Sequence, residues 1–122
     1  MDVSFILATD EIFTLMSLLP GHTEDGKRFT SEALHNAKAC DLSGLAAKKL
    51  AKATNGKLEL APGIRMIIDG IARADSAVKH GAIWEIRSPW VFLRCEKYPY
   101  QEDCWKITPV EDNESRIMDH EP

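Results

Sequence analysis

The chain has 122 residues, of which 44% are hydrophobic and 28% are charged, and its formal net charge is −4. This length and composition are typical of one globular domain and exclude a collagen, a coiled coil or an extensively disordered protein. No apolar run approaches the roughly 20 residues that cross a bilayer, so we expect no membrane partner. The negative charge disfavours nucleic-acid binding, because the neutralisation of phosphates supplies most of the affinity of such proteins.

The acidic residues are concentrated at the end of the chain. Residues 111–122 contain five acidic side chains and a single arginine, whereas the rest of the chain is close to neutral. We therefore expect one domain over residues 1–110 and a mobile acidic tail over residues 111–122. The first residues lack the basic and long apolar segments of a signal peptide, and three cysteines suit a reducing compartment. These features predict a cytoplasmic protein.

The residue pattern in the first two thirds of the chain predicts mainly helices. Capping residues such as Thr9, Thr30 and Asp41 precede apolar residues that recur every three or four positions. Pro62 suits the first turn of a helix, because its missing N–H is unpaired there. The expected order is a strand or helix lead-in at 3–7, a helix from Thr9 to Pro20, a loop at 20–29, helices at 31–40 and 42–54, a strand at 57–60, and a helix from Pro62 to His80.

From residue 82 the apolar period changes to two, which is typical of strands. We expect a three-stranded antiparallel meander over residues 82–88, 90–97 and 103–109, with a short loop at 98–101. Helices followed by strands favour the α+β class over a parallel sheet. The predicted fold is therefore α+β, with about four helices and a C-terminal three-stranded meander packed on the last helix.

The predicted strands carry a cluster of aromatic side chains that includes all three tryptophans. On a sheet these side chains form either the core or an exposed recognition surface, because Trp and Tyr dominate binding hot spots. An unpaired strand edge can also accept another strand. The sequence favours a non-catalytic protein-binding module, such as an adaptor, a chaperone-like protein or a small oligomer, whose partner is another protein or a second copy. The expected contact residues are Trp90, Tyr98, Tyr100 and Trp105.

A nucleic-acid-binding module is the first alternative. The predicted helix at 42–54 and the strand after it resemble the recognition helix and first wing strand of a winged helix in outline. However, this helix offers no Arg or Gln to read base edges, and Pro62 begins a helix where the second wing strand is needed. The phosphate-binding residues in this alternative are Lys48, Lys49, Lys52 and Lys57.

A small enzyme or ligand-binding protein is the second alternative. His22 lies close to Asp25 in a predicted loop, and His35 lies on a predicted helix, but no known catalytic motif surrounds them. A four-residue loop would place Cys95 opposite Cys104, where two thiols can pair or bind a metal. Zinc needs four ligands, however, and no histidine is near in the sequence. We therefore predict no catalytic residue, no metal and no cofactor.

The order of elements resembles the N-terminal part of the EspG-type proteins of type VII secretion systems and their relatives in Gram-positive bacteria. An early helix, ATDEIFTLMSLL, is followed by a helical segment, then GKLEL, then PGIRMIIDGIARADSA, and then strands. This similarity covers the layout of residues 8–95 and includes no diagnostic motif. The resemblance implies a cytosolic chaperone or adaptor that binds secreted proteins, and it assigns a function to no individual residue.

Overall fold

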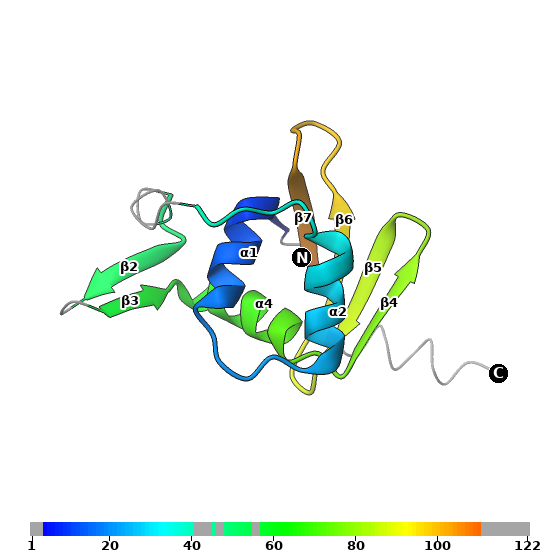
Figure 1. The fold of residues 1–122 in the computed structure, drawn as a ribbon, viewed down its shortest axis with the longest axis horizontal. Helices are drawn as coiled ribbons and strands as arrows, with labels where there is room; N and C mark the ends of the chain where they lie inside the picture. The colour runs from blue at the N-terminus through cyan, green and yellow to red at the C-terminus, as the bar shows by residue number, and fades with distance from the viewer. Residues whose placement is uncertain (1–3, 41–44, 46–47, 55–56, 111–122) are drawn as a thin grey trace.

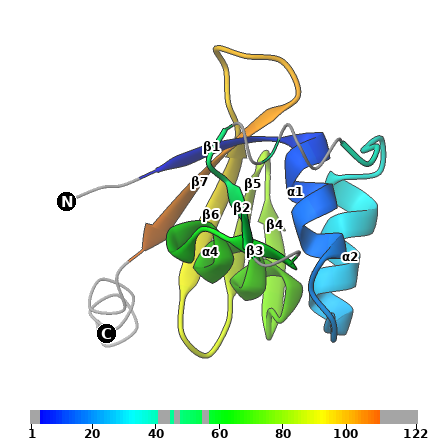
Figure 2. The same ribbon diagram turned by 90° about the vertical axis from the view of Figure 1, so that its left-hand side faces the viewer.

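The computed structural model describes residues 4–40, 45, 48–54 and 57–110. Its three described helices lie on one face of a five-stranded sheet, and a separate two-stranded hairpin projects from the side (Figures 1 and 2). The elements are β1 (Phe5–Ala8), α1 (Thr9–Ser17), α2 (Glu24–Ala33), β2 (Ala51–Thr54), β3 (Lys57–Leu60), α4 (Pro62–Ala72), β4 (Ser76–His80), β5 (Ile83–Arg87), β6 (Phe92–Lys97) and β7 (Cys104–Val110).

The five-stranded sheet has the order β1-β7-β6-β5-β4, and all its neighbours are antiparallel. Strands β4 to β7 form a meander, and the N-terminal strand β1 pairs with β7, so that the two ends of the domain meet in the sheet. Cys95 lies between Trp84 and Ile107 in one cross-strand row. All three side chains are buried, because this row faces the helices.

The core fills the space between the helices and the sheet. Phe29 of α2 meets the rings of Trp84 and Trp105 edge-on, with centroids 5.3 and 5.8 Å apart respectively. Aromatic pairs of this geometry contribute beyond their buried area. The stripe on α4 that contains Ile67 and Ile71 is fully buried against β5 and β6. The sheet's inner face is therefore closed by α4 at its centre and by α2 at the side of β4.

Two short-range contacts fix the starts of α1 and α2. The Glu11 carboxylate accepts the N–H of Ala8, which precedes α1. The Thr23 hydroxyl accepts the N–H of Gly26 as an N-cap and donates to the carbonyl of Ala74. Because Ala74 follows α4, the cap of α2 also ties α2 to the end of α4.

The predicted arrangement of four helices and a three-stranded meander is wrong. Three helices are described, and the sheet has five strands because β1 and β4 extend the meander on either side. The helix expected at 42–54 is not formed over its second half, where residues 51–54 are β2 and pair with β3. Cross-strand pairing thus outweighs the helical propensity of this alanine- and lysine-rich segment. Residues 41–44 and 46–47 lie outside the described part of the chain.

Two helix boundaries also differ from the prediction. The second helix begins after the cap Thr23 rather than after Thr30, so most of the predicted loop at 20–29 is helical. The final helix ends at Ala72, and residues 76–80 form β4 instead of its last turns. The cause is a tight hairpin: Gly81 takes a positive φ of 64° and lets β4 pair with β5. Thr9, predicted as a cap, is the first residue of α1.

Gly26 is the closest backbone contact between α2 and α4. A Cβ at this position would lie 2.4 Å from the carbonyl oxygen of Ala72, which is backbone and cannot move aside. We expect Gly26→Ala to lower the free energy of unfolding by about 1–3 kcal/mol, as overpacking does elsewhere. Urea unfolding measures this change.

Gly63→Ala is the matched control, because Gly63 is also helical and the added methyl group would lie 3.4 Å from the Phe5 ring. Alanine is the better helix former, so Gly63→Ala should be neutral or stabilising. Equal effects of the two substitutions would contradict the close approach at Gly26.

Candidate functional site

The structure separates the four predicted contact residues. Tyr98 and Tyr100 lie in the β6–β7 loop with ring centroids 5.4 Å apart, and Tyr100 is 84% exposed. Trp90 is 44% exposed in the β5–β6 turn, which lies at the opposite end of β6. Trp105 is only 3% exposed. The half-buried Tyr98 and the exposed Tyr100 therefore form one pair, which Trp90 and Trp105 do not join.

Trp105 belongs to the core and carries a specific hydrogen bond. Its indole N–H donates to the hydroxyl of Thr9 over 3.1 Å, and this hydroxyl donates to the carbonyl of Asp103. The buried indole is thus satisfied by the start of α1. Lys97, its cross-strand neighbour, holds its ammonium 4.5 Å from the centre of the Trp105 ring. A cation over an aromatic face is attracted by the ring quadrupole.

A hollow of about 360 Å³ opens between the end of α2 and the loop end of the sheet. Trp84 and Trp105 form its floor, although they are only 4% and 3% exposed, so ring edges alone are reachable. Its volume lies in the range of ligand-binding clefts. The lining residues are Glu32, Ala33, His35, Lys79, Gly81, Ala82, Trp84, Lys97 and Trp105.

A second hollow of about 200 Å³ continues the first along the side of the sheet. The two hollows share Glu32, Lys79 and Trp84, and the second adds Arg28. Because α2 packs beside β4, the two together form one groove between this helix and this strand, which we call the α2–β4 groove. Figure 1 shows β4 at the right-hand edge of the sheet and α2 in front of the strands.

The wall formed by β4 is a free strand edge. Within the described residues, β4 pairs only with β5 and is the last strand of the sheet. A two-residue turn joins His80 to Ile83, which pair with each other in the register. The pair that flanks a two-residue turn is hydrogen-bonded, and hydrogen-bonded pairs alternate along an antiparallel ladder. The backbone groups of Ala77 and Lys79 therefore point away from β5.

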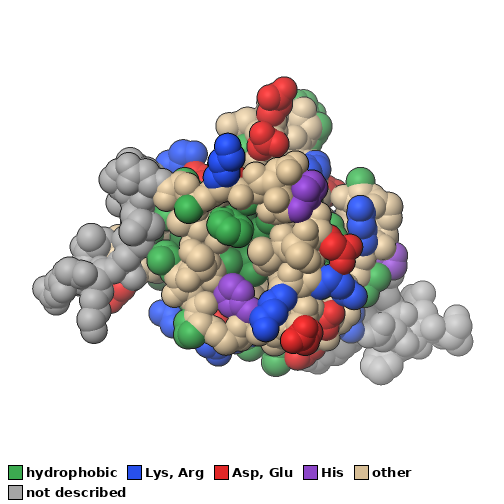
Figure 3. Space-filling view, in the orientation of Figure 1, with side chains coloured by type: hydrophobic (Ala, Val, Ile, Leu, Met, Phe, Trp, Pro, Cys, Tyr) green, Lys and Arg blue, Asp and Glu red, His purple; other side chains and the backbone are tan. Residues whose placement is uncertain are grey.

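The α2–β4 groove is lined by more positive than negative charge. Its acid, Glu32, lies 4.0 Å from Arg28 on the same helix. His35 Nδ1 donates to the carbonyl of Glu32 over 3.1 Å. Among the described residues, no carboxylate lies within 4.0 Å of the ammonium of Lys79 or Lys97, and both residues are exposed. Figure 3 shows charged side chains of both signs along the α2 side of this face.

The sequence prediction missed the two groove lysines. Lys79 falls in a segment predicted as helix, where it has no evident partner. Lys97 follows Leu93 and Cys95 at alternate positions of a predicted strand, which places all three on one face. The sequence signal for this site was therefore a lysine at the end of a strand, on the same face as the buried apolar residues before it.

No protein-family model, curated protein or solved structure matches this chain. The resemblance to EspG-type proteins is untested by these comparisons and stays a prediction. The groove must therefore be interpreted from its own geometry and charges.

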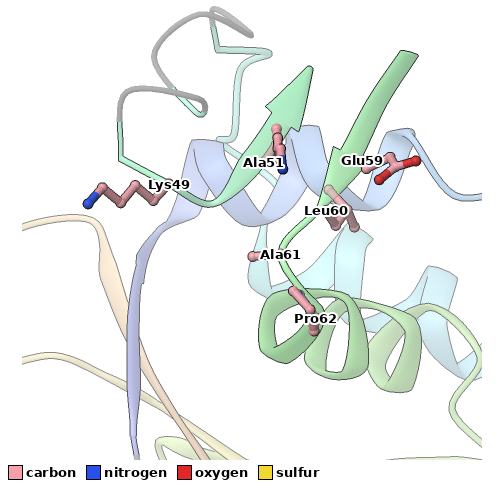
Figure 4. Close-up of a pocket in the computed structure, with 7 residues that line it drawn as sticks. Lys49, Ala51, Glu59, Leu60, Ala61 and Pro62 are labelled. Carbon is pink, nitrogen blue, oxygen red and sulfur yellow. The ribbon is translucent and has the colours of Figure 1, made fainter. Parts of the chain in front are cut away.

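Another hollow, of about 600 Å³, lies beside the β2–β3 hairpin (Figure 4). Leu60, Ala61 and Pro62 lead from β3 into α4 at its base, while Lys49 and Glu59 extend away on opposite sides. Polar groups that converge on one point are the mark of a specific ligand site, and here the labelled charges diverge. We therefore do not assign the binding site to this hollow.

The four lysines of the nucleic-acid alternative do not lie on a recognition helix. Lys48 and Lys49 lie in a turn, and Lys52 and Lys57 lie on β2 and β3. The Lys48 ammonium lies 2.6 Å from the Glu11 carboxylate, and this hydrogen bond raises the pKa of Lys48. Lys48 is thus engaged in a structural ion pair, and the winged-helix interpretation loses the helix on which it depended.

His22 and Asp25 each have a partner other than one another. The ring Nε2 of His22 donates to the carbonyl of Met16 over 2.8 Å. The Asp25 carboxylate pairs with Arg28 at 3.1 Å. Both residues hold the α1–α2 connection and the first turns of α2, so the structure gives no support to an acid–base pair here.

Cys95 and Cys104 do not face each other, as a four-residue loop would have required. Cys95 lies opposite Ile107, because Lys97 pairs with Trp105 rather than with residue 102. Cys104 is three residues further along β7, which is about 10 Å at the rise of a strand. This separation exceeds the Cα distance that a disulfide spans.

Across the described ranges, no three His, Cys, Asp or Glu side chains are grouped so that they could hold a metal ion. None of the helices described is both long and apolar enough to cross a membrane.

The two tryptophans predicted to contact a partner should differ in their effect on stability. Trp105→Ala removes a buried ring and leaves the Thr9 hydroxyl without its donor, so we expect a loss of about 3–5 kcal/mol in the free energy of unfolding. Trp90→Ala should cost less than about 1 kcal/mol, because its ring is half exposed. Urea unfolding followed by far-ultraviolet circular dichroism compares them, and equal losses would contradict the assignment of Trp105 to the core.

The buried thiols should resist alkylation in the native state. Burial raises the pKa of Cys95 far above its usual value, and burial followed by the nearby Glu11 carboxylate raises the pKa of Cys104. Only the thiolate reacts readily, so iodoacetamide at neutral pH should label Cys40, which is half-buried, before the other two. Peptide mass mapping identifies the labelled residues. Urea-unfolded protein is the control, in which all three should react at similar rates.

Proposed function

We propose that this protein is a non-catalytic protein-binding module that takes an extended segment of another protein into the α2–β4 groove. The observation that carries the proposal is the free edge of β4 beside a helix. The backbone groups of Ala77 and Lys79 point toward the place that an added strand would occupy. Strand addition between an edge strand and a helix is a recurring mode of peptide recognition, in which main-chain bonds supply affinity and neighbouring pockets supply specificity.

The other edge of the sheet is a poorer docking site. Strand β1 has four residues and continues directly into α1, and the N–H of Ala8 already donates to Glu11. By contrast, β4 has five residues, is followed by a tight turn, and borders a groove along much of its length. These differences favour β4 as the docking edge.

The pair of Tyr98 and the exposed Tyr100 supports the same interpretation. Tyr98 follows Lys97, which lines the groove, so the pair stands at the loop end of the sheet where the groove opens. The β6–β7 loop that carries it protrudes beyond the helices in Figure 2. Tyr100 therefore offers a ring to a partner that leaves the groove at this end.

The cytoplasm remains the proposed location, supported by three free cysteines.

Selection from a random peptide display library, followed by hydrogen–deuterium exchange, tests this function. We expect selected peptides to slow amide exchange in Ser76–His80, because an added strand protects the free edge. Lys79→Pro removes an outward N–H without removing a bond to β5 and is tolerated on an edge strand. It should weaken binding about tenfold, the value of one lost hydrogen bond of about 1.4 kcal/mol.

Lys79→Gln is the matched control, because it keeps the backbone N–H. Peptides that protect other segments, or that bind Lys79→Pro and Lys79→Gln equally well, would contradict strand addition at β4. Protection of β4 that rises with protein concentration in the absence of peptide would assign the edge to a second copy and overturn the proposed occupant.

A further inference from the structure

We infer that the segment taken into the α2–β4 groove is acidic, with a carboxylate bound between Lys79 and Lys97. This inference rests on the proposed function and adds the chemistry of the partner.

The two lysines approach the same part of the groove from two strands. Lys79 lies in one row with Trp84 and Cys95, and Lys97 lies two residues beyond Cys95 on β6. With strands about 4.8 Å apart and a rise of about 3.4 Å, their Cα atoms are separated by about 10 Å across the sheet and about 7 Å along it. Both side chains line the same hollow of about 360 Å³, in which one carboxylate can lie between them.

The position of the Lys97 ammonium is set before any partner binds. Its attraction to the Trp105 ring holds it 4.5 Å from the ring centre, at the floor of the groove. Trp105 is itself fixed by its bond to Thr9 and its contact with Phe29. A charge that is already in place loses less side-chain entropy on binding, which favours recognition of an opposite charge.

The remaining charged groups of the groove do not cancel these two lysines. The carboxylate of Glu32 pairs with Arg28, which also pairs with Asp25 on the same helix. Glu32 is therefore engaged within α2. His35 adds a donor at the same end. Glu102 and Asp103 lie in the adjoining loop but do not line either hollow of the groove. The lining that faces a bound strand is therefore cationic.

An apolar strand would bind poorly at this edge. Lys79 lies on the same face of β4 as the core residue Ala77, and it lines both hollows of the groove. A strand laid against β4 would desolvate the ammonium, and an unpaired charge taken out of water carries a large penalty. A carboxylate on the incoming strand removes this penalty and forms a charge-assisted hydrogen bond. Acidic segments are thus selected over apolar and basic ones.

Fluorescence anisotropy with defined peptides tests the inference. The probe is a fluorescein-labelled peptide of alternating glutamate and valine, and the matched peptides carry glutamine or lysine in place of glutamate. We expect the glutamate peptide to bind most tightly and its affinity to fall with added salt. Lys79→Glu and Lys97→Glu should each weaken binding by about tenfold or more, as charge reversal at a close pair does.

Lys52→Glu on the exposed hairpin strand β2 is the matched control, since it changes the net charge equally at a distant site. It should change the affinity by less than about twofold, because exposed charges beyond a Debye length are screened. Lys97→Gln keeps a neutral side chain over Trp105 and separates loss of charge from loss of folding, which circular dichroism checks in every variant. Equal weakening by Lys52→Glu and Lys79→Glu would overturn the inference.

The outcomes separate the inference from the function on which it rests. If the glutamine peptide binds as tightly as the glutamate peptide, and binding is lost in Lys79→Pro alone, strand addition stands and the acidic partner is wrong. If no peptide binds or protects β4, both are wrong. If a single-stranded thymidine oligonucleotide displaces the glutamate peptide and binds more tightly, the groove recognises nucleic acid and the inference fails.

Discussion

The packing of Phe29 between Trp84 and Trp105 is the contact on which the arrangement of this domain depends. The three rings come from α2, β5 and β7, so one cluster fixes a helix to two strands that are not neighbours in the sheet. The indole N–H of Trp105 then reaches Thr9 at the start of α1. Removal of this cluster would release α2 from the sheet and open the core, and it would also abolish the groove that α2 forms with β4.

The glycines at the helix contacts make this packing possible. Gly26 lets α2 approach the carbonyl end of α4, and Gly70 lets α4 approach Val91, where a Cβ would lie 2.7 Å from a methyl carbon. The Thr23 side chain uses the same close approach to donate to Ala74. Because α2 is held at its start by α4 and at Phe29 by the sheet, its distance from β4 is fixed. A groove with rigid walls costs little ordering on binding.

The strands that begin at Ile83, Phe92 and Cys104 were predictable within a few residues, since a period of two in apolar residues requires no knowledge of the partner strands. Two other strands were not predictable. They are β2, in the second half of the helix predicted at 42–54, and β4, in the last turns of the helix expected to reach His80. In both segments local propensity favours helix, while the observed strands are stabilised by pairing with β3 and β5. Such pairing is a tertiary interaction, which propensity does not report. The candidate site could not be predicted either, because the groove exists only if residues 76–80 form an edge strand.

Lys79 shows how a single residue can connect protection with recognition. An exposed edge strand invites pairing with any other edge, and a charge that points inward is one device by which proteins prevent it. The inward lysine of β4 serves this purpose, since an apolar strand that docks must bury its ammonium. The same lysine loses that effect against a strand that brings a carboxylate. Lys97, placed over Trp105 two strands away, extends the preference across the floor of the groove. Under the proposed function, an edge that repels most strands is selective for acidic ones, so that one charge on β4 serves both protection and recognition.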